Sequence, residues 1–346
     1  MNNTIIPPAT KRIEYIDALR GFTMILVVVQ HIAYFCLNIE DTPSFHTYLQ
    51  QIRMPLFYLI SGFVLYKADV VWNLSHISDF LKKKFVVQIV STLIFFTLLT
   101  HVRGYDFFEG LTSEAKYGYW FTYTLFFYFI FYSIIRFVCR KNEDFIVLLI
   151  AGLFYLLKWP TLYQALPFSD IVKDTLGINH WHYFCFFLLG TLIKKHFDYV
   201  QNLMENGMTL LVCILVFFLF NLYKDLIPDR GLLGVVIQFC KSFSGVLIVF
   251  AFFRNKQSLF SKEKKMGRCL QYIGKRTLDI YLLHYFLLPS QLTHITSVFK
   301  DYPMPVVEFT LSLVLALLVI AFCLLISNII RLNPTLAHWL FGVKRK

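Results

Sequence analysis

The chain has 346 residues, of which 57% are hydrophobic and 16% are charged, and its mean hydropathy is +0.60. An average soluble domain is about 45–50% apolar and about 25% charged. The composition therefore excludes an ordinary soluble domain and predicts an all-α fold, a polytopic membrane helix bundle. Because a spanning helix needs about 20 apolar residues, we expect about ten transmembrane helices in a chain of this length.

The formal net charge of +12 would also suit a nucleic-acid-binding protein. The basic residues, however, concentrate in the N-terminal arm, in every second loop and in the C-terminal tail. This is the charge bias that orients membrane proteins, with the basic side in the cytoplasm. We therefore expect a multi-pass protein of the cell (inner) membrane with both termini cytoplasmic. Its partners would include membrane lipids and no nucleic acid, and the sequence leaves homo-oligomer formation open.

A cytoplasmic arm at 1–14 leads into ten apolar segments, and a cytoplasmic tail at 332–346 follows the last. The predicted spans are 16–38, 53–67, 84–101, 119–138, 145–159, 181–197, 208–223, 232–253, 277–294 and 306–331. Their length and continuous apolar character favour helices that cross the bilayer. Since no segment between them suits a separate soluble domain, we predict one integral membrane domain over 1–346, with any site inside the bundle.

The seven cysteines fall singly, mostly inside apolar spans, and lack metal-type spacing. We interpret them as packing residues and predict no metal site. The sequence also lacks a Walker loop, a zinc signature and a Gly-x-Ser-x-Gly elbow, which removes the commoner soluble chemistries.

The first predicted span, within YIDALRGFTMILVVVQH, contains Arg20 and His31. Eleven helical residues make about 1,100°, within about 20° of whole turns, and rise about 16 Å, so the two side chains share a face. Asp17, three residues before Arg20, can pair with its guanidinium. With Arg20 at one membrane surface, His31 lies near mid-bilayer, where an ionisable group usually lines a substrate path. Alternatively, Arg20 is a helix-end anchor and His31 is satisfied by Gln30 or a neighbouring helix.

Three features of later segments lie at helix ends or contacts. Arg53 opens the second span at the outer surface, and Ser61-Gly62 in the same span is a small pair that lets another helix approach closely. Trp120 lies near a predicted interface, where tryptophan anchors helices. The structural explanation, packing for Ser61-Gly62 and anchoring for Trp120, is the simpler one for these two features.

Lys241 falls in the middle of the eighth span, so its ammonium needs a partner inside the bundle. A structural ion pair, for which Asp279 of the ninth span is a candidate partner, is favoured over a role of Lys241 in chemistry. His284 lies five residues after Asp279, about 500° round the helix, so these two do not form one patch.

On the cytoplasmic side, Lys82, Lys83 and Lys84 open the third span, and Arg276 belongs to the basic loop before the ninth. Anchoring to anionic lipid explains most residues of this kind. A phosphate-bearing cytosolic donor would use the same charges.

With these spans laid out, the chain resembles the acyltransferase-3 family, bacterial multi-pass enzymes that move acyl groups, often acetyl, from cytosolic donors to extracytoplasmic glycans. Four stretches carry the resemblance, in the family's order: YIDALRGFTMILVVVQH, RMPLFYLISGF, HYFCFFLLGTLIKK and IGKRTLDIYLLHYFLLP. Overall, the sequence is most similar to the branch of the family that resembles fucose O-acetylases.

The resemblance implies that His31 is catalytic and that Arg20 organises the donor or the active site. Asp17, which can pair with Arg20, would orient it. The family's Arg-x-x-Arg pair near the third span is replaced here by KKKFVV. The other expected site residues are Lys82, Lys83, Lys84 and Arg276 on the donor side, and Arg53, Trp120 and His284 on the acceptor side.

The predicted function is a membrane O-acyltransferase, specifically an O-acetyltransferase. It would move an acyl group from cytosolic acyl-CoA (acetyl-CoA), a substrate and not a permanently bound cofactor, to a hydroxyl of a surface polysaccharide or lipid-linked glycan. His31 would be a general base or would carry the acyl group itself, and the sequence leaves both open.

The alternative is a secondary transporter or glycan flippase in which His31, Lys241 and Asp279 relay protons. Inverted repeats with broken helices in matching positions would favour the transporter, and the sequence shows no such repeat.

Overall fold

A computed structural model of the chain describes residues 13–37, 45–139, 143–222, 231–289 and 304–343, together with the single residues 292, 299 and 302. The secondary structure of these residues is helical, without a strand, so the predicted all-α fold is confirmed. The predicted arm at 1–14 lies almost entirely outside the described residues, as does the end of the predicted tail.

Short π- or 3-10 segments, labelled η, interrupt or extend several of the α-helices. The helices up to α9 are α1 (Glu14–His31), η1 (Ile32–Cys36), α2 (His46–Leu65), α3 (Leu74–Phe85), η2 (Val86–Val90), α4 (Ser91–Arg103), α5 (Phe107–Thr112), η3 (Lys116–Gly118), α6 (Trp120–Val138), α7 (Glu143–Tyr155), η4 (Leu156–Lys158), α8 (Pro160–Gln164) and α9 (Asp170–Leu176). Those that follow are η5 (Ile178–Tyr183), α10 (Phe184–Lys195), α11 (Phe197–Glu205), α12 (Gly207–Leu222), α13 (Leu232–Asn255), α14 (Lys265–Lys275), α15 (Thr277–Leu287), α17 (Pro305–Ile330) and α18 (Pro334–Phe341).

Among the described residues, five helical stretches are long and apolar enough to cross a membrane: Glu14–Cys36, Leu74–Arg103, Trp120–Val138, Leu232–Asn255 and Pro305–Ile330. A sixth candidate is the pair α11 and α12, bent by 77°. Helices α7, α10 and α15 have only 13, 12 and 11 residues, fewer than the about 20 that span a bilayer. The multi-pass helix bundle is confirmed, whereas ten crossings and cytoplasmic termini stay predictions.

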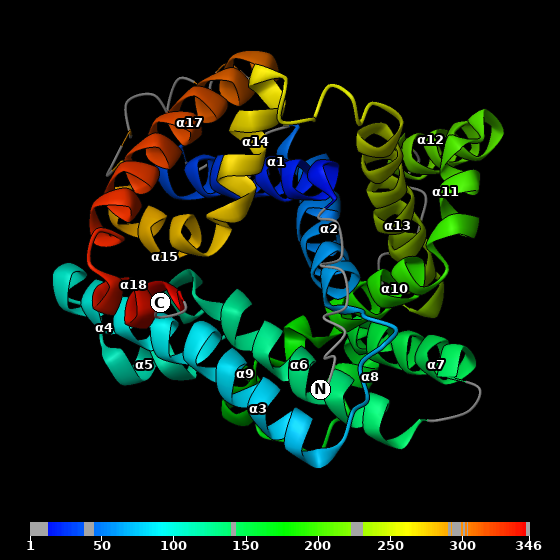
Figure 1. Ribbon diagram of the computed structural model, residues 1–346, viewed down its shortest axis with the longest axis horizontal. Helices are drawn as coiled ribbons and strands as arrows, with labels where there is room; N and C mark the ends of the chain where they lie inside the picture. The colour runs from blue at the N-terminus through cyan, green and yellow to red at the C-terminus, as the bar shows by residue number, and fades with distance from the viewer. Residues whose placement is uncertain are drawn as a thin grey trace, which may run out of the picture.

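Helix α1 lies against α2, α13, α14, α15 and α17, and Figure 1 shows α14, α15 and α17 gathered beside it. Two glycines allow the closest of these approaches. A Cβ on Gly21 would lie 2.0 Å from the Leu270 carbonyl oxygen, and one on Gly274 would lie 1.9 Å from that of Asp17. The backbones of α1 and α14 therefore touch, and the buried Asp17 lies in this contact. The contact also sets α15, the next helix, against α1.

A second glycine contact joins α2 to α10. A Cβ on Gly62 would lie 1.9 Å from the Phe187 carbonyl oxygen, and one on Gly190 would lie 2.0 Å from that of Leu59. The hydroxyl of Ser61 donates to the Phe57 carbonyl of its own helix, at 2.8 Å. The packing role predicted for Ser61-Gly62 is therefore confirmed.

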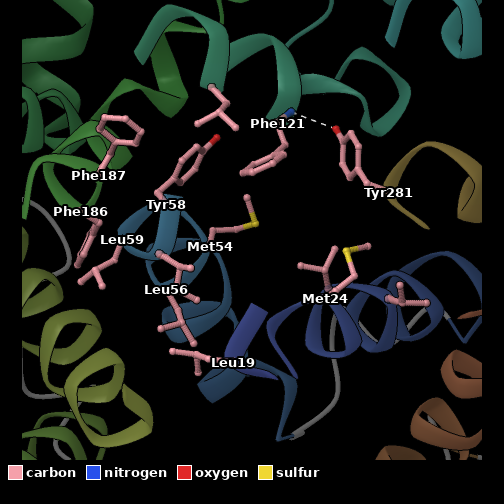
Figure 2. Packing of buried hydrophobic residues seen from close by; sticks show 14 of the residues in the cluster. Leu19, Met24, Met54, Leu56, Tyr58, Leu59, Phe121, Phe186, Phe187 and Tyr281 are labelled. Carbon is pink, nitrogen blue, oxygen red and sulfur yellow. Dashed lines mark hydrogen bonds between the residues drawn. The ribbon is translucent and has the colours of Figure 1, made fainter. Parts of the chain in front are cut away.

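Large aromatic and sulfur-containing side chains fill the centre of the bundle. Figure 2 shows Met24 of α1, Met54 of α2, Phe121 of α6 and Tyr281 of α15 grouped around one space. The Tyr281 hydroxyl also accepts the backbone N–H of Phe121, at 3.2 Å. These four helices enclose the candidate site.

Candidate active site

Helices α1 and α15 bring together two histidines that are 253 positions apart in the sequence. Nδ1 of His31 lies 2.8 Å from Nε2 of His284. The rings are almost parallel, with 9° between their planes and 5.0 Å between their centroids. The chain changes from α to π geometry directly after His31, at Ile32–Cys36, and such π turns often occur at functional sites. Two site residues that the sequence places in separate spans therefore form one pair.

The carbonyl oxygen of Ile280 determines which ring nitrogens carry protons. It lies 3.0 Å from Nδ1 of His284, and because a carbonyl only accepts, this Nδ1 carries the proton. In a neutral ring Nε2 of His284 is then an acceptor, and Nδ1 of His31 donates to it. Neutral His31 consequently has its lone pair on Nε2, as a general base requires.

His31 lines a small cavity of about 50 Å³, called the inner cavity below. His284 is fully buried and does not line this cavity, so it stands behind His31. The surrounding wall is largely apolar and includes Met24, Met54, Phe121 and Tyr281 (Figure 2). A cavity of this size has room for only a small chemical group beside His31.

Two tyrosines of α15 hold the loop that borders the inner cavity. The hydroxyls of Tyr281 and Tyr285 both donate to the carbonyl oxygen of Gly118, at 2.8 and 3.0 Å. The ring centroid of Tyr285 lies 5.2 Å from that of His31. Gly118 has a φ of +97°, and Lys116 and Tyr117 before it have φ of +48° and +47°. Residues other than glycine rarely adopt a positive φ, and backbone strain of this kind is often found at functional sites.

A larger cavity of about 450 Å³, called the outer cavity below, adjoins the inner one, because Arg53, Met54 and Trp120 line both. The indole of Trp120 stacks on His180, with 3.8 Å between ring centroids and 22° between planes. His180 precedes the sixth predicted span, and burial lowers its pKa to about 4. A neutral imidazole therefore supports the indole. Two of the three residues predicted for the acceptor, Arg53 and Trp120, lie where the cavities meet.

Arg20 lies in the first half of α1, away from His31. Its Nη2 donates to Oγ1 of Thr277 at 3.2 Å, which ties the start of α15 to α1. Lys84 is near enough for its charge to interact with that of Arg20, whereas the two lysines before it are exposed. Of the lysines predicted for the donor, one lies close to Arg20.

The predicted pairing of Asp279 with Lys241 is wrong. The Asp279 carboxylate accepts from Nε and Nη2 of Arg331, at 2.8 and 2.9 Å, and Nη1 of Arg276 lies 3.6 Å away. Arg276 also donates to the Ser327 hydroxyl at 2.9 Å. A planar guanidinium satisfies both carboxylate oxygens, which a single ammonium cannot do. Lys241 lines the outer cavity instead.

Sequence reasoning missed Tyr285, which follows His284 directly, and Lys158, which lines the outer cavity. For Lys158 the signal was present, since its charge interrupts the end of the predicted fifth span. In the described part of the chain, no three His, Cys, Asp or Glu side chains gather as a metal site would require.

The fold and the site describe a multi-pass membrane protein with a histidine pair beside a buried cavity. The model of the acyltransferase-3 family, described as an acyltransferase domain, matches residues 13–328. The chain belongs to this family and is therefore a membrane acyltransferase. No curated protein and no solved structure matches it.

Proposed function

We propose that the protein is an O-acyltransferase, most simply an O-acetyltransferase, which moves an acyl group from cytosolic acyl-CoA to a hydroxyl of a surface polysaccharide or lipid-linked glycan. The observation that carries this proposal is the hydrogen-bond chain from the Ile280 carbonyl through His284 to His31. It leaves a lone pair on Nε2 of a residue that lines the inner cavity. Membership of the acyltransferase family supports acyl transfer.

In the proposed reaction, Nε2 of His31 takes the proton of the acceptor hydroxyl as its oxygen attacks the thioester carbonyl carbon. A C–O bond forms, the C–S bond breaks, and the departing CoA thiolate takes the proton from Nε2. His31 returns to its neutral form. His284 does not meet the substrate but orients His31 and accepts from Nδ1 of the imidazolium, as the third member of a catalytic triad does. It is a positioning residue.

The donor would approach from the end of α1 where Arg20 lies. The helix rises about 16 Å from Arg20 to His31, a span of the order of the pantetheine arm of CoA. The charged part of the donor would meet Arg20 and Lys84, whose charges interact. The planar guanidinium of Arg20 can donate to two oxygens of one phosphate group at once.

The acceptor would occupy the outer cavity. Its volume of about 450 Å³ lies within the range of about 300–1,000 Å³ that is usual for ligand pockets. Arg53 and Trp120 line both cavities, so a sugar beside them extends towards His31. Aromatic rings such as Trp120 offer an apolar face for a sugar ring.

The transporter alternative loses support from the position of Asp279. This carboxylate is 1% exposed and is bonded to Arg331, whereas Lys241 lines the outer cavity and His31 the inner one. Asp279 therefore lies apart from the two adjoining cavities that His31 and Lys241 line.

The acyl state of the host's surface glycan tests the proposal. Mass spectrometry would compare cells that carry the protein with cells that lack it, and with cells that carry His31→Ala. His101→Ala is the matched control, because His101 is an exposed histidine of α4. We expect acyl groups with the wild type and the control and none in the other two strains. An unchanged acyl pattern across all four strains would reject this function.

A further inference from the structure

Arg53 of α2 lines the inner cavity together with His31. The two side chains are near enough for a charge on His31 to interact with that of the guanidinium. Nε of Arg53 is buried and has no hydrogen-bond partner in the part of the chain that the structure describes. Because a guanidinium stays protonated in proteins, Arg53 brings a permanent positive charge to the side of His31.

The surroundings of Arg53 leave this charge available to a ligand. Among the described residues, the titratable groups that act on it are the hydroxyls of Tyr34, Tyr183 and Tyr285, and no carboxylate is one of them. Phenols are neutral at neutral pH. Neither of the two cavities has an aspartate or glutamate among its described lining residues. Since a buried charge is costly without an opposite charge, this position suits a negative charge that develops during a reaction.

Other hydrogen-bond donors of the inner cavity are engaged elsewhere. The hydroxyls of Tyr281 and Tyr285 donate to one carbonyl of the neighbouring loop, and Nδ1 of His31 donates to its histidine partner. Of the described side chains that line this cavity, Arg53 and Trp120 keep donors for a ligand, and Arg53 is the charged one. Hydrogen bonds from a charged donor are stronger than those from a neutral one.

We propose that Arg53 is a catalytic residue of acyl transfer, whose guanidinium donates to the carbonyl oxygen of the thioester and stabilises the oxyanion that forms there. The inference rests on the proposed function. Attack of the acceptor oxygen forms the C–O bond, and the electron pair of the carbonyl π bond moves onto the carbonyl oxygen. When the C–S bond breaks, this pair restores the carbonyl, and the CoA thiolate takes the proton from Nε2 of His31.

The charges that appear during the reaction favour this role. When His31 takes the proton of the acceptor it becomes an imidazolium, and the guanidinium of Arg53 is near it. Two cations in a site of low dielectric repel each other. An oxyanion that contacts Arg53 and lies beside His31 attracts both cations. The arrangement is therefore most favourable in the transition state, as catalysis requires.

A transfer assay with a small acceptor separates this role from sugar binding. The purified full-length protein in detergent would receive acetyl-CoA and glycerol, and the released CoA would be measured as free thiol, with the rate of His31→Ala as background. Because no glycan is present, a loss of activity does not come from a lost sugar contact. We expect Arg53→Met to lower kcat about 10²–10³-fold, the usual effect of removing one oxyanion donor, with little change in KM for acetyl-CoA.

Added guanidinium ion provides a signature that a packing role would not give. At a concentration that does not denature the protein, it should restore part of the kcat of Arg53→Ala, because the free cation can occupy the place of the lost side chain. Arg268→Met is the matched control, because Arg268 is an exposed arginine of α14, and it should behave as the wild type. If Arg53→Met does not fold, Arg53→Gln takes its place with the same expected loss, since its amide is polar but carries no charge.

A wild-type kcat in the folded Arg53→Met protein would overturn the catalytic role and leave acyl transfer itself intact. Wild-type transfer to glycerol together with lost transfer to the surface glycan would also overturn it, and would assign Arg53 to acceptor binding alone. By contrast, a wild-type protein that shows no His31-dependent transfer, either to glycerol or to the glycan, would reject the proposed function.

Discussion

His284 lies behind His31, and its Nε2 accepts a hydrogen bond from Nδ1 of His31 at 2.8 Å. The Ile280 carbonyl holds the far side of His284 at 3.0 Å. A single backbone oxygen thus fixes the tautomer of a residue two hydrogen bonds away, and the role of His284 is open to direct test.

His284→Phe keeps a ring of similar shape but removes the acceptor for Nδ1 of His31. We expect the turnover rate for acyl transfer to fall by up to about 10⁴-fold, as it does when the residue that orients a catalytic histidine is lost, with little change in KM for acyl-CoA. His284→Gln, whose amide oxygen can accept the same proton, should retain more activity than the Phe variant. A folded His284→Phe protein with wild-type turnover would show that His31 needs no partner.

Gly118→Ala tests the strained loop beside His31. A Cβ there would lie 2.1 Å from the Tyr285 ring, so Tyr285 must move and the inner cavity changes shape. A displacement of about 1 Å at a reacting centre can cost about 100-fold in rate, and we expect a loss of that order in steady-state kinetics.

Gly104→Ala is the control for this change. Gly104 also has a positive φ, +68°, but a Cβ added there would have nothing within 4 Å. The variant should lose about 1 kcal/mol of stability through the left-handed backbone and keep its activity. Equal activity losses in the two variants would assign the effect to backbone strain and not to Tyr285.

Gly21→Ala should separate α1 from α14, since the new Cβ would lie 2.0 Å from the Leu270 carbonyl oxygen. Overpacking of this kind costs about 1–3 kcal/mol, which thermal denaturation in detergent would register as a lower Tm. Gly152→Ala in α7, where nothing lies within 4 Å, should be neutral or slightly stabilising, because alanine favours a helix. Matching Tm values for the two variants would contradict the close contact of α1 and α14.

Asp279→Asn should destabilise the bundle by about 3–5 kcal/mol, because it leaves Arg331 without its buried counter-charge. The double change Asp279→Asn with Arg331→Met should recover much of this loss. Lys241→Met in place of Arg331→Met should not, since Lys241 lines a different part of the protein. Thermal denaturation measures the stability of the three variants. Recovery of stability by Lys241→Met would support a pairing of Lys241 with Asp279.

The sequence predicts much of what depends on local pattern. The shared helix face of Arg20 and His31 follows from their spacing within one span. The close helix contact at Gly62 follows from a small residue in an apolar helix. These features need no knowledge of which helices are neighbours.

The partner of His31 could not be found in this way, because His284 is 253 positions away and periodicity does not say which spans pack together. The partner of Asp279 was missed for a related reason. Several cations were available to it, and only the packing of α15 on α17 selects Arg331. The convergence of Arg53, Lys158 and Lys241 likewise depends on three elements meeting at one cavity.

Arg20 and His31 should have separable roles. Arg20→Lys replaces a planar fork with a point charge, so we expect a higher KM for acyl-CoA, with activity that recovers as donor concentration rises. An unchanged KM with a reduced turnover rate would indicate that Arg20 acts in the chemical step and not in donor binding.

The most direct test of the account compares donor binding with acyl transfer in purified His31→Ala protein, with His101→Ala as control and size-exclusion chromatography to show that both are folded. Radiolabelled acetyl-CoA would report both quantities. We predict that His31→Ala binds acetyl-CoA as the wild type does but transfers no label to the glycan, because it lacks the base that lines the inner cavity. Full transfer by a folded His31→Ala protein would contradict the mechanism.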